Sequence, residues 1–180
     1  MPRNTGTSPG TRQLVLAASR GDRGAFAALH ELYAAMVHGM LLARVPVQEA
    51  DDLVQDVFLH ALGKLRGLRD PDAFGPWLAA LTRNFAVRFH RRRRRTDQLP
   101  VDIPARTGDE ADPGDALRVL AAIRAMPEAY RETLVLRLVE GLTGPEIAAC
   151  TGITHGSVRV NLHRGMQLLR EKLAKTEDES

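Results

Sequence analysis

Apolar residues recur at helical spacing along most of this chain, and polar residues fill the positions between them. The segments with this spacing are 12–19, the stretch between Asp22 and Pro46, 47–62, the stretch from about Pro76 into five arginines at 91–95, 116–125 and 127–140. Asp22 can cap the second segment, and Pro46 ends it. Strand-like alternation of useful length is absent, so the pattern predicts an all-α protein.

Residues 142–175 contain two helical patterns separated by one tight break. Thr143 and Glu146 have the spacing of a capping box, and Gly152 can end the first helix in a left-handed conformation. Thr154 can cap the second helix, which carries an apolar stripe opposite a polar and basic face. The stripe comprises Val158, Leu162, Met166, Leu169 and Leu173, and the opposite face comprises Gly156, Ser157, Val160, His163 and Arg164. The pattern predicts a helix-turn-helix whose second helix enters a DNA major groove, although a plain helical hairpin with one exposed polar face would show a similar pattern.

Charge is concentrated in blocks, although the net formal charge is only +3. Residues 71–95 hold seven arginines and one acid, Asp72, a net of +6. Residues 96–115 hold six acids and Arg106, a net of −5, together with three prolines and two glycines. This composition predicts an unfolded acidic linker between two domains. The opposite charges also suggest that the linker masks the arginines in the free protein.

Several other classes of protein are not supported by the sequence. A single cysteine, Cys150, cannot form an internal disulfide, and none of the six histidines has a partner at helical ligand spacing, so no metal site is predicted. The acids at 51, 52 and 56 share an exposed face with Gln55 rather than a pocket, which argues against catalysis. The apolar runs are shorter than 18 residues and a signal-peptide core is missing, so we expect a soluble cytoplasmic protein without membrane insertion. We also expect no cofactor.

Four segments resemble, in order and spacing, motifs of the extracytoplasmic-function (ECF) group of bacterial sigma-70 factors. They are DLVQDVFL at 52–59, FGPWL with TRN at 74–84, MPEAYRETLVLR at 126–137, and the segment 140–164. The resemblance implies two small helical domains, sigma region 2 at 12–95 and sigma region 4 at 116–175, joined by the flexible acidic linker at 96–115. The composition predicts a disordered N-terminus at 1–11 and an acidic tail at 176–180.

The resemblance further implies a transcription initiation factor that binds RNA polymerase core, recognises minus-ten and minus-thirty-five promoter elements and assists melting. Its partners would be the clamp helices of the largest polymerase subunit, the flap region, double- and single-stranded promoter DNA, and an anti-sigma factor. The alternative is a helix-turn-helix regulator that acts without replacing the resident sigma factor. The docking motif at 52–58 favours the first reading, because a repressor does not need it.

The site residues follow from the matched motifs. Core polymerase binding falls on Asp51, Asp52, Gln55, Asp56 and Phe58. Minus-ten DNA binding falls on Lys64, Arg66, Trp77, Arg83, Asn84 and Arg88. Minus-thirty-five DNA binding falls on His155, Ser157, Arg159, Val160, Asn161, His163 and Arg164. Val160, Asn161 and Met166 depart from the family pattern, which leaves the base preference of this helix open.

Overall fold

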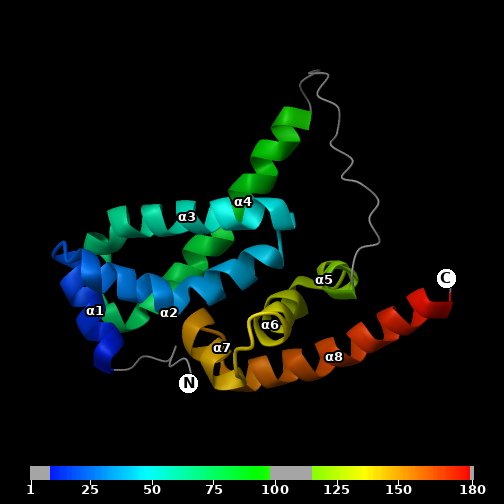
Figure 1. The fold of residues 1–180 in the computed structure, drawn as a ribbon. Coiled ribbons are helices and arrows are strands. Elements are labelled where there is room, and N and C mark those ends of the chain that lie inside the picture. The colour runs from blue at the N-terminus through cyan, green and yellow to red at the C-terminus, as the bar shows by residue number, and fades with distance from the viewer. Residues whose placement is uncertain (1–8, 98–114, 179–180) are drawn as a thin grey trace.

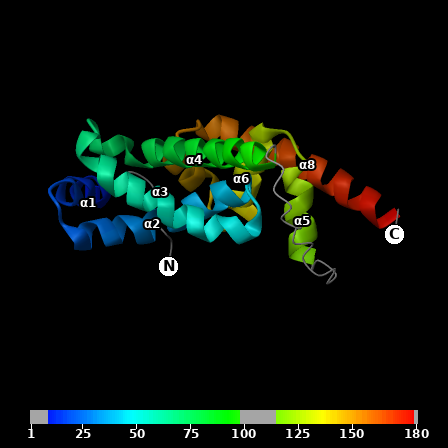
Figure 2. The same cartoon turned by 90° about the horizontal axis from the view of Figure 1, so that it is seen from above.

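The computed structural model describes residues 9–97 and 115–178, and within these ranges the chain forms eight α-helices, two short 3-10 helices and no strand. The predicted all-α class is therefore confirmed. The helices form two groups, which we call the N-terminal bundle (α1–α4) and the C-terminal bundle (α5–α8). In both Figure 1 and Figure 2, α1 and the far end of α8 lie at opposite ends of the molecule.

The N-terminal bundle is built around its second helix. Its elements are α1 (Pro9–Ser19), α2 (Arg23–Leu42), α3 (Val47–Lys64), η1 (Leu65–Gly67), η2 (Pro71–Ala73) and α4 (Phe74–Asp97). The carboxylate of Asp22 caps α2, accepting a hydrogen bond from the Ala25 backbone N–H at 3.0 Å. Helix α2 packs against α1, α3 and α4, and Leu29 and Met36 along it are almost completely buried. The continuous apolar spacing of this segment is thus explained by helices on several sides.

The C-terminal bundle consists of α5 (Asp115–Arg124), α6 (Glu128–Leu138), α7 (Gly144–Thr151) and α8 (His155–Asp178). Helix α6 lies at its centre and packs against the other three. Close approach of α8 depends on Gly165, where an added Cβ would lie 3.0 Å from Cδ1 of Leu134. The first turns of α8 pack through Val158 and leave their other side exposed.

The two bundles are in direct contact. Helix α2 packs against α6, α4 packs against α7, and the buried residues of both bundles form one continuous cluster. The resemblance implies two domains joined by a linker, and it does not anticipate this contact. Most of the predicted linker, residues 98–114, lies outside the described residues, as do 1–8 and 179–180.

Several helix ends differ from the sequence expectations. Helix α1 begins at Pro9, so residues 9–11 are helical rather than part of a disordered N-terminus, and Thr11 is buried. Helix α4 begins at Phe74, ahead of Pro76, and extends through the five arginines to Asp97. Helix α8 continues to Asp178, into the predicted acidic tail. Each extension lengthens a helix that the sequence pattern predicts, and the ends of a helix are the part that such a pattern predicts least well.

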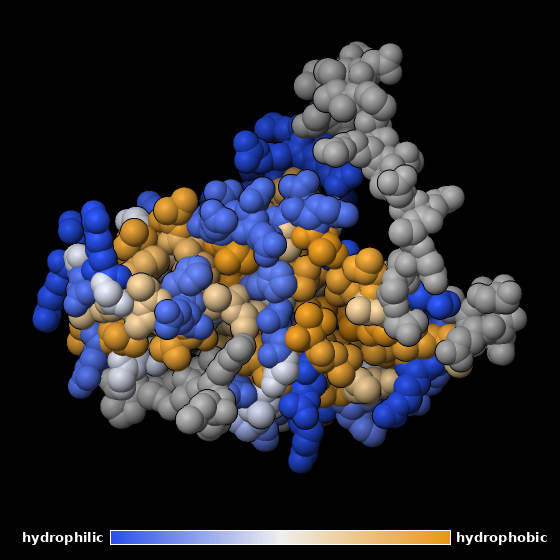
Figure 3. Space-filling view, in the orientation of Figure 1, coloured by the Kyte–Doolittle hydropathy of each residue, from blue (hydrophilic) through white to orange (hydrophobic). Residues whose placement is uncertain are grey.

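Helix α2 is the one described helix that is long and apolar enough to cross a membrane, judged by length and composition alone. Half of its most apolar window is buried inside the protein, and the core helix of a globular protein passes the same test. The charged surface lies elsewhere: in Figure 3, hydrophilic side chains cover the projecting end of α4.

The left-handed residue after α7 provides a test of the helix-turn-helix turn. Gly152 has φ 77°, and a Cβ there would lie 3.1 Å from Cβ of Pro76 in the other bundle. We expect Gly152→Ala to lower the free energy of unfolding by about 1–2 kcal/mol, because an L residue is strained in this conformation. Urea unfolding followed by circular dichroism measures the change.

Gly63→Ala is the matched control, because a Cβ at this position in α3 would meet nothing within 4 Å. It should leave stability unchanged or raise it by up to about 1 kcal/mol. Equal stability of Gly152→Ala and the wild type would contradict the argument for the turn.

Candidate promoter and polymerase interfaces

The turn between α7 and α8 is held by local hydrogen bonds. Glu146 Oε2 accepts from the backbone N–H of Thr143 at 2.7 Å, and Thr143 Oγ1 accepts from the Glu146 N–H at 3.4 Å, so the predicted capping box is present. Gly152 closes α7 in the left-handed conformation, and Thr154 Oγ1 accepts from the Ser157 N–H at 3.2 Å. These bonds fix how α8 leaves the turn.

The first turns of α8 present a polar and basic face to solvent. Of the residues predicted to bind minus-thirty-five DNA, His155, Ser157, Arg159, Val160, His163 and Arg164 are exposed, and Asn161 is half-buried. Val158 and Leu169 on the opposite side are buried, which confirms the predicted orientation of the helix. A shallow recess is lined by Arg159, Val160, His163 and Arg164. Cationic and imidazole donors around one apolar side chain suit base edges and a thymine methyl group.

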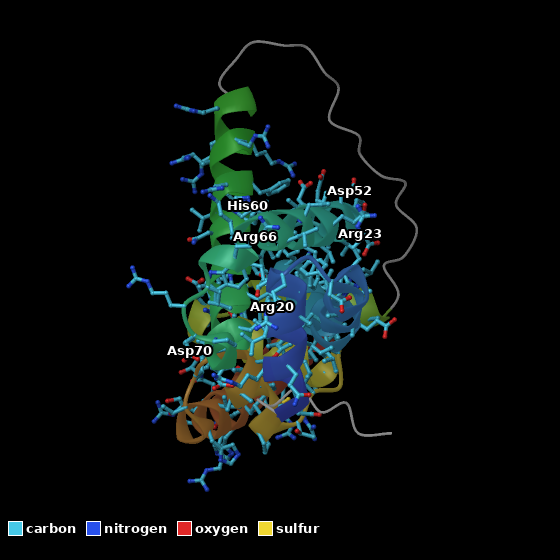
Figure 4. The ribbon with its side chains drawn as sticks, turned by 90° about the vertical axis from the view of Figure 1, so that its left-hand side faces the viewer. Arg20, Arg23, Asp52, His60, Arg66 and Asp70 are labelled. Atoms are coloured by element: carbon cyan, nitrogen blue, oxygen red, sulfur yellow. The ribbon has the colours of Figure 1, made fainter. Side chains whose placement is uncertain are left out.

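A second basic surface lies on the outer side of α4. Asn84, Arg88 and the arginines 91–95 are exposed there. The Arg88 guanidinium lies 5.9 Å from the centre of the Phe85 ring, which also packs edge-on against His60 of α3 at 5.5 Å. These ring contacts anchor the base of the basic helix against α3. Figure 4 shows His60 and Arg66 on the side of α3 and η1 that faces α4.

The other predicted minus-ten residues are divided between surface and core. Lys64 and Arg66 are exposed at the end of α3 and in η1. Trp77 is half-buried, and its ring lies 5.8 Å from that of Phe74 in the core. Lys64 and Arg66 can therefore meet phosphate directly, whereas Trp77 has only part of its ring available.

Arg83 has a different position from the other predicted DNA contacts. Its Nη2 donates to Glu132 Oε1 at 2.7 Å and its Nε to Glu132 Oε2 at 3.1 Å, both across the contact between the bundles. The same carboxylate accepts from Arg44 Nη2 at 2.6 Å, and only 5% of the Glu132 side chain is exposed. Neither Glu132 nor Arg44 is among the predicted functional residues, because their pairing joins parts of the chain that lie far apart in the sequence.

All five predicted polymerase-binding residues lie on α3, and four of them are exposed at the surface. Asp51, Asp52, Gln55 and Asp56 are exposed, and Figure 4 shows Asp52 on the outer side of the helix. Phe58 is instead only 3% exposed, with its ring 4.3 Å from that of His30 in the core. Its helical position places it on the apolar stripe, so the motif match assigns a buried residue to a surface.

The apolar part of the α3 surface comes from residues that the prediction omits. Leu59 is 68% exposed and Leu62 is 45% exposed, close in helical spacing to Gln55 and Asp56. A signal for Leu59 was present, because its helical position lies off the side of α3 formed by Val57, Phe58 and Ala61, which is buried. The outer face of α3 thus combines carboxylates with two exposed leucines, a composition suited to a protein partner.

The contact between the bundles also contains two weakly acidic groups. Burial raises the pKa of the Cys150 thiol to about 12, with Glu132 contributing further, and burial raises the pKa of Tyr33 to about 12. A buried thiol with this pKa is unreactive at neutral pH. The described residues include no group of three or more His, Cys, Asp or Glu side chains that could hold a metal ion.

Comparison with known protein families decides between a sigma factor and a helix-turn-helix regulator that acts without replacing the sigma factor. The Sigma-70 region 2 family matches residues 29–96, and the Sigma-70 region 4 family matches residues 116–169. ECF sigma factors of mycobacteria are 31% identical to it over 179 residues. The chain therefore belongs to the sigma-70 family, in its ECF group. It is a transcription initiation sigma factor, and sigma factors are non-enzymatic transcription factors. The N-terminal bundle is sigma region 2, and the C-terminal bundle is sigma region 4.

Similar sigma factors are found in several bacteria. The RNA polymerase sigma factor CarQ of Myxococcus xanthus is 34% identical over 164 residues, covering 87% of this chain and 94% of CarQ. The ECF sigma factor SigD of Mycobacterium tuberculosis is 31% identical over 179 residues, covering 92% of this chain and 84% of SigD. The match to SigE of Mycolicibacterium smegmatis, at 32% identity, covers 73% of this chain and spans 54% of that protein.

Among solved structures, CnrH in complex with the cytosolic domain of CnrY is similar with a TM-score of 0.64 and 25% identity. The similarity covers 92% of this chain and 98% of CnrH, so it includes both bundles.

The exposed face of α8 generates a prediction about base reading. We expect Arg164→Ala to relax the preference at one or two base pairs of the minus-thirty-five element, by about 1–3 kcal/mol, because an arginine can bind guanine in a bidentate manner. Arg159→Ala should weaken binding to all sequences more evenly and flatten the salt dependence, as expected for a phosphate contact. A randomised minus-thirty-five library, transcribed with core polymerase and each variant, measures both effects.

Asn161→Arg is the control for charge alone, and it should raise affinity broadly without changing the preferred sequence. A base profile of Arg164→Ala that matches the wild-type profile would contradict the assignment of this arginine to base reading.

Proposed function

We propose that this sigma factor binds RNA polymerase core through the outer face of α3 and directs it to promoters through two DNA surfaces. Lys64, Arg66 and the outer side of α4 hold the minus-ten element, where Arg88 and Arg83 contact phosphate and Asn84 contacts an unpaired base. The exposed face of α8 reads the minus-thirty-five element. The factor acts in the cytoplasm, contributes binding and promoter melting, and uses no catalytic group or cofactor of its own.

The observation that carries this proposal is the composition of the α3 face. Asp52 and Asp56 are exposed beside Leu59, which is 68% exposed, on a helix whose only predicted DNA contact is Lys64 at its far end. A regulator that only binds DNA has no use for an acidic and apolar helix face, because carboxylates repel the phosphate backbone. A protein partner uses the leucines for affinity and the carboxylates for orientation. Phe58 supports this helix from the core and does not touch the partner.

An anti-sigma factor is the second protein partner that we propose. The similar protein CnrH was solved with the cytosolic domain of CnrY. The similarity to CnrH extends over both bundles, which supports a protein partner of the same kind for this chain.

Charge reversal on α3 tests the docking proposal. We expect the double variant Asp52→Lys and Asp56→Lys to weaken core binding at least tenfold, about 1.4 kcal/mol, because opposed like charges at an interface are costly. Fluorescence anisotropy with labelled sigma factor measures the affinity, and circular dichroism shows whether the helices remain. Promoter-specific transcription should fall with core binding.

A double variant with the same change of charge, Glu31→Lys and Glu171→Lys, is the matched control, because both residues are exposed and lie outside α3. It should bind core like the wild type. If the free protein protects promoter DNA at physiological salt and core adds nothing, the chain acts as a stand-alone regulator instead.

A further inference from the structure

One buried carboxylate joins the two bundles. Glu132 of α6 is held by Arg44, at the end of α2, at 2.6 Å and by Arg83 of α4 at 2.7 Å and 3.1 Å. Only 5% of the Glu132 side chain and 11% of the Arg44 side chain are exposed. The acid belongs to sigma region 4 and both arginines belong to sigma region 2. Separation of the bundles therefore breaks every one of these bonds.

Other polar contacts also link the two bundles at this interface, which we call the joint. Arg124 of α5 donates from Nε to the Leu42 carbonyl at 2.8 Å and from Nη2 to the Val45 carbonyl at 2.5 Å. His38 Nδ1 lies 2.8 Å from Glu140 Oε1, in hydrogen-bonding contact. The carbonyls at the end of α2 have no partner within their own helix, so Arg124 supplies a bond that the helix end lacks.

The backbones also approach closely across the joint. A Cβ at Gly39 of α2 would lie 2.7 Å from Cγ of Glu140. A Cβ at Gly75 of α4 would lie 3.2 Å from the Cα of Cys150 in α7. Cys150 is 0% exposed, and Gly75 is one of the residues that cover it. The joint is thus fitted like a protein interior rather than like a loose contact between domains.

The pairing of Arg83 occupies the atoms that a phosphate would need. A guanidinium binds carboxylate and phosphate with the same planar pair of donors, and Glu132 already holds Nε and Nη2 of Arg83. Arg83 therefore exchanges one anionic partner for another when it meets DNA.

We propose that Glu132 is an intramolecular substitute for DNA phosphate, which holds Arg83 and keeps the sigma factor closed until the bundles separate. This inference rests on the proposed role of α4 in DNA binding. It assigns masking of the basic helix to a residue of sigma region 4, whereas the charge pattern of the sequence suggests the acidic linker.

The single cysteine serves as a natural reporter of opening, because Cys150 lies buried against α4 at the joint. The experiment follows the reaction of the full chain with a maleimide fluorophore. We expect Glu132→Gln to raise the rate at least about tenfold, because Arg44, 11% exposed, and Arg83, 33% exposed, lose their charged partner in the closed form. Core polymerase should also raise the rate for the wild type.

A second variant removes the influence of charge on the thiol. Glu132→Gln removes a negative charge near Cys150 and by itself favours the reactive thiolate, whereas Arg44→Gln removes a positive charge and does not. Both weaken the joint, so faster reaction of both variants reports opening. Glu171→Gln, an exposed change of equal charge on α8, should react like the wild type.

DNA binding by the free protein provides the functional readout. The probe is a short duplex without promoter sequence, titrated at several salt concentrations. Glu132→Gln should bind more tightly than Glu171→Gln, with a log–log salt slope steeper by about 0.9, equivalent to one additional phosphate contact. Arg83→Gln in the Glu132→Gln background should remove that gain.

The outcomes separate this inference from the proposed function. Unchanged thiol reaction in both joint variants, or a salt slope equal to that of Glu171→Gln, overturns the role of Glu132. Core-dependent transcription by the wild type would then still support the sigma function. Opening without a steeper slope also overturns the inference, because Arg83 would be free and yet would not hold phosphate.

Discussion

The arrangement of this sigma factor depends on one carboxylate that has almost no contact with water. Glu132 is 5% exposed, and a charge in such a place is tolerated only with close partners of opposite sign. Arg44, in the turn after α2, and Arg83 of α4 supply them from the other bundle. These two ion pairs therefore hold α6 against the end of α2 and against α4. Since Arg83 is also a predicted DNA contact, the interaction that closes the fold involves a residue that we propose binds DNA in the open protein.

The remaining surfaces suit recognition of large partners. The α3 face is acidic and apolar, the outer side of α4 is basic, and the start of α8 is basic with one exposed valine, Val160. The α3 face and the start of α8 lie on helices whose opposite sides are packed in the core, so their side chains are held in place before a partner arrives. The arginines at 91–95 lie on the exposed end of α4. The capping box at Thr143 and the left-handed Gly152 give α8 the same rigidity.

Local features of this structure could be predicted from the sequence, and the contacts between distant segments could not. Asp22, Thr143 and Gly152 act through neighbours within a few residues, so their roles follow from spacing. Arg83 and Glu132 are 49 residues apart, and nothing local to α6 distinguishes Glu132 from a solvated acid. Phe58 was assigned to the polymerase-binding surface from the motif match, although its helical spacing places it in the core.

The central claim, that the free protein is closed and the polymerase-bound protein is open, is tested most directly by the distance between the bundles. Donor and acceptor dyes at Gln13→Cys in α1 and Gln167→Cys in α8, both exposed positions, report this distance in a Cys150→Ala background. Single-molecule energy transfer should show one population for the free protein, and its efficiency should fall after core polymerase is added. The same efficiency in both states would contradict the account.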